Sequence, residues 1–251
     1  MKRVSGFLAL TLILALLVGV MPFSAAAYTA EQYNTADALN QLGLFLGTGT
    51  TYALDDNLTR EQGIVLLVRM LGMEQTAMNG SWEHPFQDVP EWVSPYVGYA
   101  YEEGLTNGIS ATEFGGGLVM TDQMFLTLCL RVIGYSDING GSDFTYNNVW
   151  SFAKTFSLIG SAEPDSSFTR GETVMVFWRL LNLHMKDTRK TLAERLLGRG
   201  VFTKAQWQTA VYIQANGRYI PDASGEPDPI TQPETPSPTP NAGSDIETPL
   251  F

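Results

Sequence analysis

The chain has very little cysteine and histidine: Cys129 is its only cysteine, and His84 and His184 are its only histidines among 251 residues. A single cysteine excludes a disulfide within the chain. Neither histidine has neighbours at the spacing of a metal site. We interpret Cys129 as a small core residue rather than a catalytic thiol, because it falls on the apolar face of a predicted helix. Stability must therefore come from packing, and the chain is long enough for a sizeable core.

Positive charge is also scarce. The chain has 15 Lys and Arg against 26 Asp and Glu, which gives a net charge of −11. This balance argues against nucleic acid or an anionic membrane surface as the main partner. An anionic ligand would have to be held by individually placed arginines rather than by the overall field.

The chain lacks the residue groups that typically carry out catalysis. The acidic pairs at 55–56 and 102–103 consist of adjacent residues, which point in different directions and cannot flank a bond as glycosidase carboxylates do. The glycine run at 115–117 has no Lys-Ser/Thr after it, so it does not indicate a phosphate loop. We predict a protein that is not an enzyme and uses no cofactor and no metal.

Only one long apolar run occurs, over residues 7–20, and it is shorter than the roughly 20 residues that span a bilayer. Lys2 and Arg3 precede it, and small residues at 24–27 follow it, which is the pattern of a secretory signal peptide. We predict a signal peptide over residues 1–27, with an uncleaved anchor as the alternative. After cleavage the chain is expected to be secreted and soluble, with no membrane partner.

Proline is rare before residue 221. Eight of the 13 prolines come from there onward, together with six acidic residues and no Lys or Arg. This composition offers too little apolar surface to fold. We predict an extended tail or linker over residues 218–251.

The most informative feature that is present is a helix pattern that occurs three times. Thr59, Thr121 and Thr169 each precede a segment whose apolar residues fall at i, i+3, i+4 and i+7. Threonine is a favoured N-cap, and Gln62 and Glu172 complete a capping box in the first and third copies. The apolar positions are Ile64, Leu67, Val68 and Leu71, then Leu126, Cys129, Leu130 and Ile133, then Val174, Phe177, Trp178 and Leu181.

A shorter helical pattern and a glycine-bearing loop precede each cap, so each copy reads as helix, loop, helix. We place the copies at residues 28–72, 82–134 and 144–182. A unit of this size cannot bury its apolar face alone, so the three are expected to pack together. Residues 183–217 predict a further helical extension that closes the array. The predicted fold class is all-α, with at most minor β structure.

These residues resemble the S-layer homology (SLH) repeat. The motifs that carry the resemblance are Phe86-x-Asp88-Val89-Pro90-x-Trp92, Gly104-Leu105, Gly108-Ile109, Phe114, Leu58-Thr59-Arg60-Glu61 and Phe168-Thr169-Arg170-x-Glu172. The resemblance implies a pseudo-threefold set of helices with ligand grooves between repeats, and no catalysis or metal. It also implies non-covalent anchoring to a cell wall, mostly in Gram-positive bacteria, through an anionic secondary cell-wall polysaccharide, often through its pyruvate ketal.

The copies depart from this pattern in three places. The first lacks a clear Asp-Val-Pro segment. In the second, Asp122 stands where the pattern has arginine and Met124 where it has glutamate. The third has Tyr-Asn-Asn-Val-Trp at 146–150 in place of the Asp-Val-x-x-Trp block. We expect the groove that would use the second arginine to bind an anion weakly or not at all.

Thr59-Arg60 and Thr169-Arg170 are the predicted contacts for an acidic sugar. An arginine directly after an N-cap lies where backbone N–H groups are unpaired and the helix dipole is positive. A carboxylate placed there would meet free amides and a bidentate guanidinium together. Helix chemistry alone favours a solvated first-turn arginine instead, and the resemblance reverses that preference.

Three further residues are candidates for ligand contact. Trp92 and Trp150 could cover the apolar face of a sugar, and a packing role is about equally supported. Asp88 could accept sugar hydroxyls, or form a turn by bonding its own backbone. The alternative function is a protein-interaction or surface-assembly module that uses the same grooves without binding glycan.

Overall fold

The computed structural model describes residues 28–137, 143–159 and 168–218. The predicted signal peptide and all but the first residue of the predicted tail lie outside the described residues. Within those ranges the regular structure is helical and strand pairing is limited to isolated bridges, which confirms the all-α prediction. The helices are α2 (Ala30–Gln41), α3 (Arg60–Met70), α4 (Glu74–Asn79), α5 (Ser94–Glu102), α6 (Asp122–Val132), the 3₁₀ helix η1 (Tyr146–Asn148), α7 (Val149–Thr155), α8 (Arg170–Asn182), α9 (Leu192–Gly198) and α10 (Lys204–Asn216).

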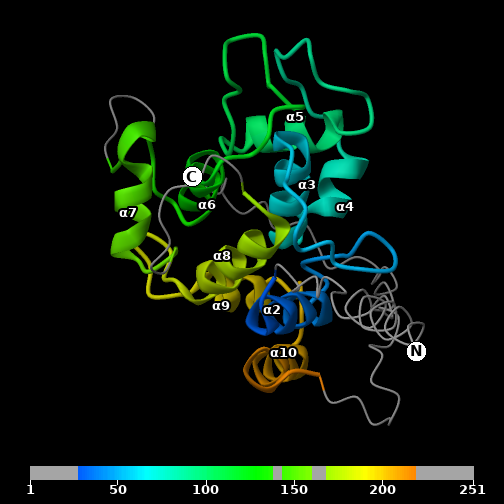
Figure 1. The fold of residues 1–251 in the computed structure, drawn as a ribbon. Helices are drawn as coiled ribbons and strands as arrows, with labels where there is room; N and C mark the ends of the chain where they lie inside the picture. The colour runs from blue at the N-terminus through cyan, green and yellow to red at the C-terminus, as the bar shows by residue number, and fades with distance from the viewer. Residues whose placement is uncertain (1–27, 138–142, 160–167, 219–251) are drawn as a thin grey trace, which may run out of the picture.

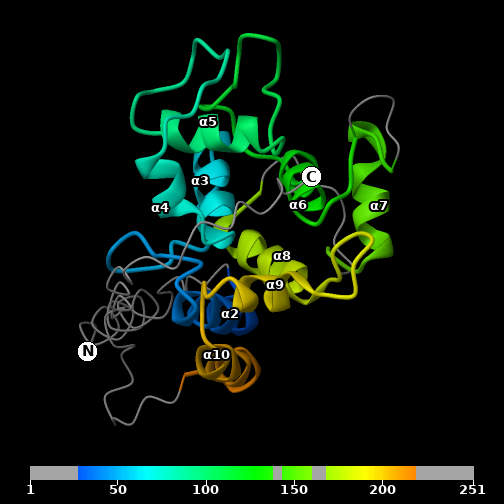
Figure 2. The same cartoon turned by 180° about the vertical axis from the view of Figure 1, so that it is seen from behind.

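Three inner helices, α3, α6 and α8, lie around the middle of the molecule, and α5, α7 and α2 lie outside them (Figure 1, and from behind in Figure 2). Helix α3 packs against α5, α6 against α7, and α8 against α2. Along the chain the helix pairs are α2–α3, α5–α6 and α7–α8. Each inner helix therefore packs on the outer helix of the following pair, and α8, in the last pair, packs on α2, in the first pair. Because the main packing partners belong to different pairs, no pair can bury its apolar face by itself.

The inner helices begin where the sequence predicts. Thr59, Thr121 and Thr169 are N-caps, and each side-chain oxygen accepts a hydrogen bond from the backbone N–H three residues later. Helices α3 and α8 also have the reciprocal bond of a capping box. Helix α6 lacks it because Met124 stands at the third position and has no strong acceptor.

The residues directly before the three caps meet at the centre. The backbone N–H of Leu58 donates to the carbonyl of Phe168 (3.0 Å), and that of Met120 donates to the carbonyl of Leu58 (2.7 Å). The Phe125 ring stacks on Phe168, with ring centroids 4.8 Å apart. Cys129 is fully buried on α6, and burial raises the pKa of its thiol, which agrees with a core role.

The extension after α8 forms α9 and α10, as predicted, and α10 packs on α2. The Trp207 ring stacks on Trp178, with centroids 5.4 Å apart. Arg218 pairs with buried Asp37 (3.2 Å), whose other oxygen accepts a hydrogen bond from the Tyr52 hydroxyl (2.6 Å). Among the helices described here, none is both long and apolar enough to cross a bilayer.

The turn after each outer helix needs a left-handed residue. Gly43 (φ 72°) and Gly104 (φ 68°) supply it after α2 and α5, and Ser157 (φ 55°) stands in the same place after α7. A residue with a Cβ pays a conformational cost of about 1 kcal/mol there, which glycine does not.

Ser157→Gly should therefore raise the free energy of unfolding by roughly 1 kcal/mol, measured by urea titration. The reciprocal change Gly104→Ser should lower it by a similar amount, since a Cβ at Gly104 would meet no atom within 4 Å and only the backbone cost applies. A destabilised Ser157→Gly variant would contradict this reading of the turn.

A charged cluster links α3, α4 and α5. Arg69 donates to both carboxylate oxygens of Glu74, and the Tyr96 hydroxyl donates to the same carboxylate (2.8 Å). The hydrogen bond from Arg69 lowers the pKa of Glu74 against the opposing effect of burial.

Glu74→Gln should lower the free energy of unfolding at pH 7 by about 1 to 2 kcal/mol, because it removes a charge-assisted pair from a partly buried site. The folded-state pKa of Glu74 is lowered, so its contribution is present above the unfolded value of about 4.3 and is lost as pH falls through the folded value. Urea titrations should show that the unfolding free energies of wild type and Glu74→Gln converge as the pH is lowered. A gap that stays constant from pH 7 to pH 2 would contradict this assignment.

Candidate functional site

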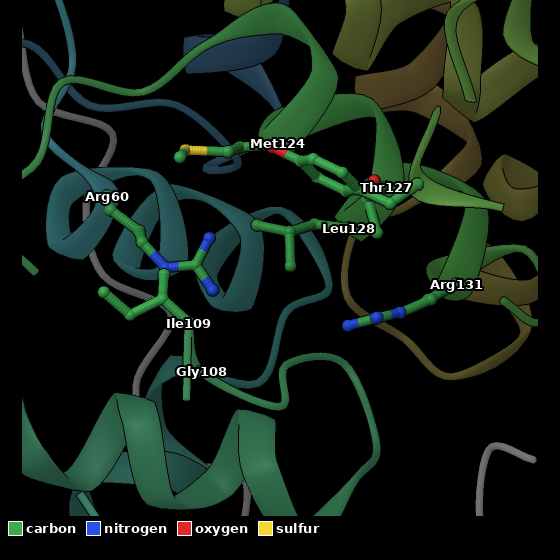
Figure 3. Close-up of a pocket in the computed structure, with 8 residues that line it drawn as sticks. Arg60, Gly108, Ile109, Met124, Thr127, Leu128 and Arg131 are labelled. Atoms are coloured by element: carbon green, nitrogen blue, oxygen red, sulfur yellow. The ribbon is translucent and has the colours of Figure 1, made fainter. Parts of the chain in front are cut away.

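One cavity of about 330 Å³ opens beside the N-terminal end of α3 (Figure 3). It draws walls from all three helix pairs: the start of α3, the loop after α5, one face of α6, and η1. The lining residues are Arg60, Gly108, Ile109, Met124, Thr127, Leu128, Arg131 and Tyr146.

The Arg60 guanidinium points into this cavity (Figure 3), and the residue as a whole is only 7% exposed. Its Nε donates to the carbonyl of Phe114 (2.9 Å) and its Nη2 to the hydroxyl of Thr106 (3.2 Å), with the Phe114 ring 5.0 Å from the guanidinium carbon. Burial lowers the pKa of Arg60, but an arginine stays protonated in proteins. No ion pair in the described ranges involves Arg60, so a buried positive charge faces the cavity without a bound carboxylate.

Arg131 approaches from the other side of the cavity, but its charge is balanced. Its Nε and Nη2 donate to the two oxygens of Asp137 (both 2.8 Å), and its Nη1 donates to the carbonyl of Leu105 (2.9 Å). The sequence does not single out Arg131 as a candidate site residue. Of the two cavity cations, Arg60 is therefore the one that lacks a counter-ion.

The remaining walls are largely apolar. Met124, Leu128 and Ile109 form them, and Ile109 (49% exposed) and Tyr146 (43% exposed) stand at the mouth. The carbonyl of Tyr146 accepts a hydrogen bond from the Gln123 side chain, which fixes η1 beside α6. The sequence reading did not predict any of these four as site residues.

The prediction of unpaired amides at the start of α3 is wrong. The N–H of Arg60 donates to the carbonyl of Leu118 (2.9 Å), that of Glu61 to Gly116 (3.1 Å), and that of Gln62 to the Thr59 side chain (3.3 Å). Residues 116–118 of the next helix pair run against this helix end and fill its donors. Thr59 is therefore a cap, and its helix end offers no free N–H to an anion.

The same correction applies to α8. The N–H of Arg170 donates to the carbonyl of Asp56 (2.9 Å), that of Gly171 to Leu54 (2.8 Å), and that of Glu172 to the Thr169 side chain (3.2 Å). These carbonyls belong to the first helix pair, so the third pair contacts the first, and the three pairs form a closed ring.

Arg170 repeats the contacts of Arg60 at another junction. Its Nε donates to the carbonyl of Tyr52 (2.8 Å) and its Nη2 to that of Leu46 (3.0 Å), with the Phe45 ring 4.8 Å from the guanidinium carbon. The alternative of a solvated first-turn arginine is therefore wrong for both residues. Unlike Arg60, Arg170 does not line the cavity. The loop between α7 and α8, which corresponds in the chain order to the loops that Arg60 and Arg170 contact, includes residues 160–167, which lie outside the described residues.

The structure does not bring the other predicted residues into the cavity. Asp88 is exposed and accepts hydrogen bonds from the N–H groups of Phe114 and Gly115 (both 2.7 Å). Desolvation would raise the pKa of Asp88, but these hydrogen bonds outweigh it and the pKa is lowered. Trp92 is 55% exposed, and Trp150 is half-buried under the Lys154 ammonium (4.3 Å). A sugar contact by these three stays a prediction.

Arg170→Met should lower the free energy of unfolding by about 1 to 3 kcal/mol, since it leaves two carbonyls at a packed junction without their donor. Arg189→Met, on an exposed loop, is the matched control and should change it by less than about 0.5 kcal/mol. Urea titration measures the unfolding free energy of both variants. Equal effects of the two substitutions would contradict the junction role of Arg170.

The comparisons with known proteins point to bacterial surfaces. The S-layer homology domain family matches residues 85–121, a stretch that ends directly before Asp122. The chain is 27% identical over 237 residues to a "Cell surface protein" of Thermoanaerobacter kivui, covering 88% of this chain and 30% of the relative. It is 30% identical over 186 residues to the "Middle cell wall protein" of Brevibacillus brevis, covering 69% of this chain and 18% of the relative.

A third relative is an "Endoglucanase" of Bacillus sp., 28% identical over 147 residues, covering 53% of this chain and 15% of the relative. The chain thus spans less than a third of the length of each of these relatives. The similarity covers a shared part of larger proteins of different kinds.

Proposed function

We propose that this chain, which carries an S-layer homology domain at residues 85–121, anchors an exported protein to the bacterial cell wall by binding an anionic secondary cell-wall polysaccharide. The observation that carries the proposal is the Arg60 guanidinium, buried and without a carboxylate at the wall of a 330 Å³ cavity. Relatives named for the cell wall and cell surface support the location.

The energetics of Arg60 favour an anionic ligand. Burying a charge costs free energy that two neutral acceptors and an aromatic ring offset only in part. A carboxylate in the cavity would complete a charge-assisted hydrogen bond to the remaining guanidinium nitrogen. Arg131 does not compete for this carboxylate, because its guanidinium Nε and Nη2 already donate to Asp137.

The size of the cavity and its mouth suggest how a polysaccharide would bind. A volume of about 330 Å³ is at the small end for ligand pockets and suits a single sugar unit. Ile109 and Tyr146 at the mouth offer apolar surface to a sugar ring. A pyruvate ketal is the acid we propose, because its carboxylate can reach Arg60 while the ring stays at the mouth.

We also propose that residues 28–72, 82–134 and 144–182 are three SLH repeats. The capped inner helices and the cyclic packing of each on the next pair support this, as does the arginine that crosses two of the junctions. Residues 183–217 then form a cap on the array, with α10 covering α2.

One observation favours the alternative, a protein-interaction or surface-assembly module. Trp92, Ile109, Leu118 and Val119 are all about half exposed, and all lie on the loops that flank α5. Exposed apolar side chains of this kind often mark a partner surface.

The test is retention on purified cell-wall sacculi before and after chemical removal of the polysaccharide. Wild type should bind only the untreated sacculi. Arg60→Met should lose at least tenfold in affinity, while Arg170→Met, which removes the equivalent junction contact away from the cavity, should bind like wild type. Binding that survives polysaccharide removal would favour the protein-interaction alternative, and equal losses in both variants would reject the Arg60 cavity as the site.

A further inference from the structure

Charge is distributed very unevenly between two parts of the described chain. Residues 80–121 carry six Asp and Glu and no Lys or Arg, whereas residues 183–218 carry seven Lys and Arg against two Asp and Glu. The first range is α5 with the two loops that flank it, and the second contains α9 and α10. Figure 1 and Figure 2 both show α5 and its loops at one end of the molecule and α10 at the other. The two ends therefore carry opposite charge.

The two loops that flank α5, residues 80–93 and 103–119, form one surface, which we call the loop face. The N–H of Gln87 donates to the carbonyl of Thr112 (2.9 Å), and the Asp88 carboxylate accepts from the amides of residues 114 and 115, so the loops are joined. The exposed apolar and acidic side chains of the loop face are Trp92, Ile109, Leu118, Val119, Glu83, Asp88, Glu91 and Glu113. No ion pair in the described ranges involves these carboxylates. The loop face thus presents unbalanced negative charge beside apolar surface.

The outer side of α10 offers the complementary combination, and we call it the extension face. Val211 and Tyr212 are 43% and 60% exposed, and they follow exposed Lys204 by seven and eight residues, a spacing that places all three on one side of the helix. Exposed Arg199 lies just before this helix. Neither Arg199 nor Lys204 forms an ion pair within the described residues. The extension face thus presents positive charge beside apolar surface.

We propose that the loop face of one copy of this chain docks on the extension face of a second copy, head to tail. The two faces match in both respects, since each offers apolar surface and their charges are opposite. Pairing of two loop faces is opposed because like charges would meet. The acidic tail after residue 218 matches the extension face in charge but has little apolar surface to cover Val211 and Tyr212. A second copy is therefore the better occupant.

The position of the two faces determines what kind of assembly forms. Because they lie at opposite ends of the molecule, one copy can bind a neighbour at each end. A contact between two different faces leaves one face of each kind free in every complex, so further copies can add to an open chain. A contact between exposed charges is also screened by salt. Association should therefore grow with protein concentration and weaken with ionic strength.

The experiment is sedimentation velocity of the whole chain without polysaccharide, over a range of micromolar concentrations. Wild type should form species larger than a dimer, and raising NaCl from about 0.05 M to about 0.5 M should weaken association at least about tenfold. One double variant, Glu91→Lys with Glu113→Lys, makes the loop face basic. The other, Arg199→Glu with Lys204→Glu, makes the extension face acidic. Each double variant alone should be monomeric, because both of its faces then carry the same charge.

An equimolar mixture of the two double variants is the sharpest test. In the mixture the basic loop face meets an acidic extension face, and the acidic loop face meets a basic extension face, so association should return. Lys154→Glu, an exposed charge reversal on α7, is the control and should associate like wild type. Circular dichroism should show unchanged helical content in every variant, since all the substituted side chains are exposed.

Wild type that stays monomeric at every concentration would overturn the proposal. So would association that stops at a dimer, which indicates a symmetric contact, and so would a mixture that fails to associate. Double variants that associate as wild type does would overturn it as well. None of these outcomes bears on the anchoring function, because the measurement contains no polysaccharide.

Discussion

The structure depends on one kind of contact: an inner-helix arginine that reaches across a junction to the loop of the next helix pair. Arg60 and Arg170 each donate to backbone or hydroxyl oxygens of that loop and lie over one of its aromatic rings. Each guanidinium fork satisfies acceptors that the packed junction would otherwise leave unpaired. Because every inner helix packs on the outer helix of the following pair, these contacts hold the ring closed.

The two arginines share this structural role, and one of them also faces a ligand-sized space. The difference comes from their surroundings. Around Arg60 the loop after α5, one face of α6 and η1 leave a cavity. The junction contact accounts for the Nε and Nη2 of Arg60 and leaves its positive charge unbalanced, which gives the cavity its chemistry. Under the proposed function, this buried cation, which the fold already needs, would also hold an anion.

The sequence predicts the elements of this fold well because their causes are local. Thr59, Thr121 and Thr169 cap the helices they precede, and the apolar spacing behind them faces the core. The wrong prediction was that the N-terminal ends of α3 and α8 offer free backbone N–H groups to an anion. The carbonyls that fill these ends belong to residues 116–118 and 54–56, in other helix pairs, so no local pattern shows that the ends are already filled. The cavity walls escaped prediction for the same reason, since Tyr146 and Met124 become neighbours of Arg60 only in the closed ring.

The most direct test of the central claim is to watch the two guanidinium groups by NMR, in chain labelled with ¹⁵N-arginine, during titration with the purified acidic polysaccharide. The account predicts a large, saturable shift of the Arg60 Nε–H resonance, with the Arg170 Nε–H resonance unchanged. A shift at Arg170 with none at Arg60, or saturable binding that moves neither resonance, would contradict it.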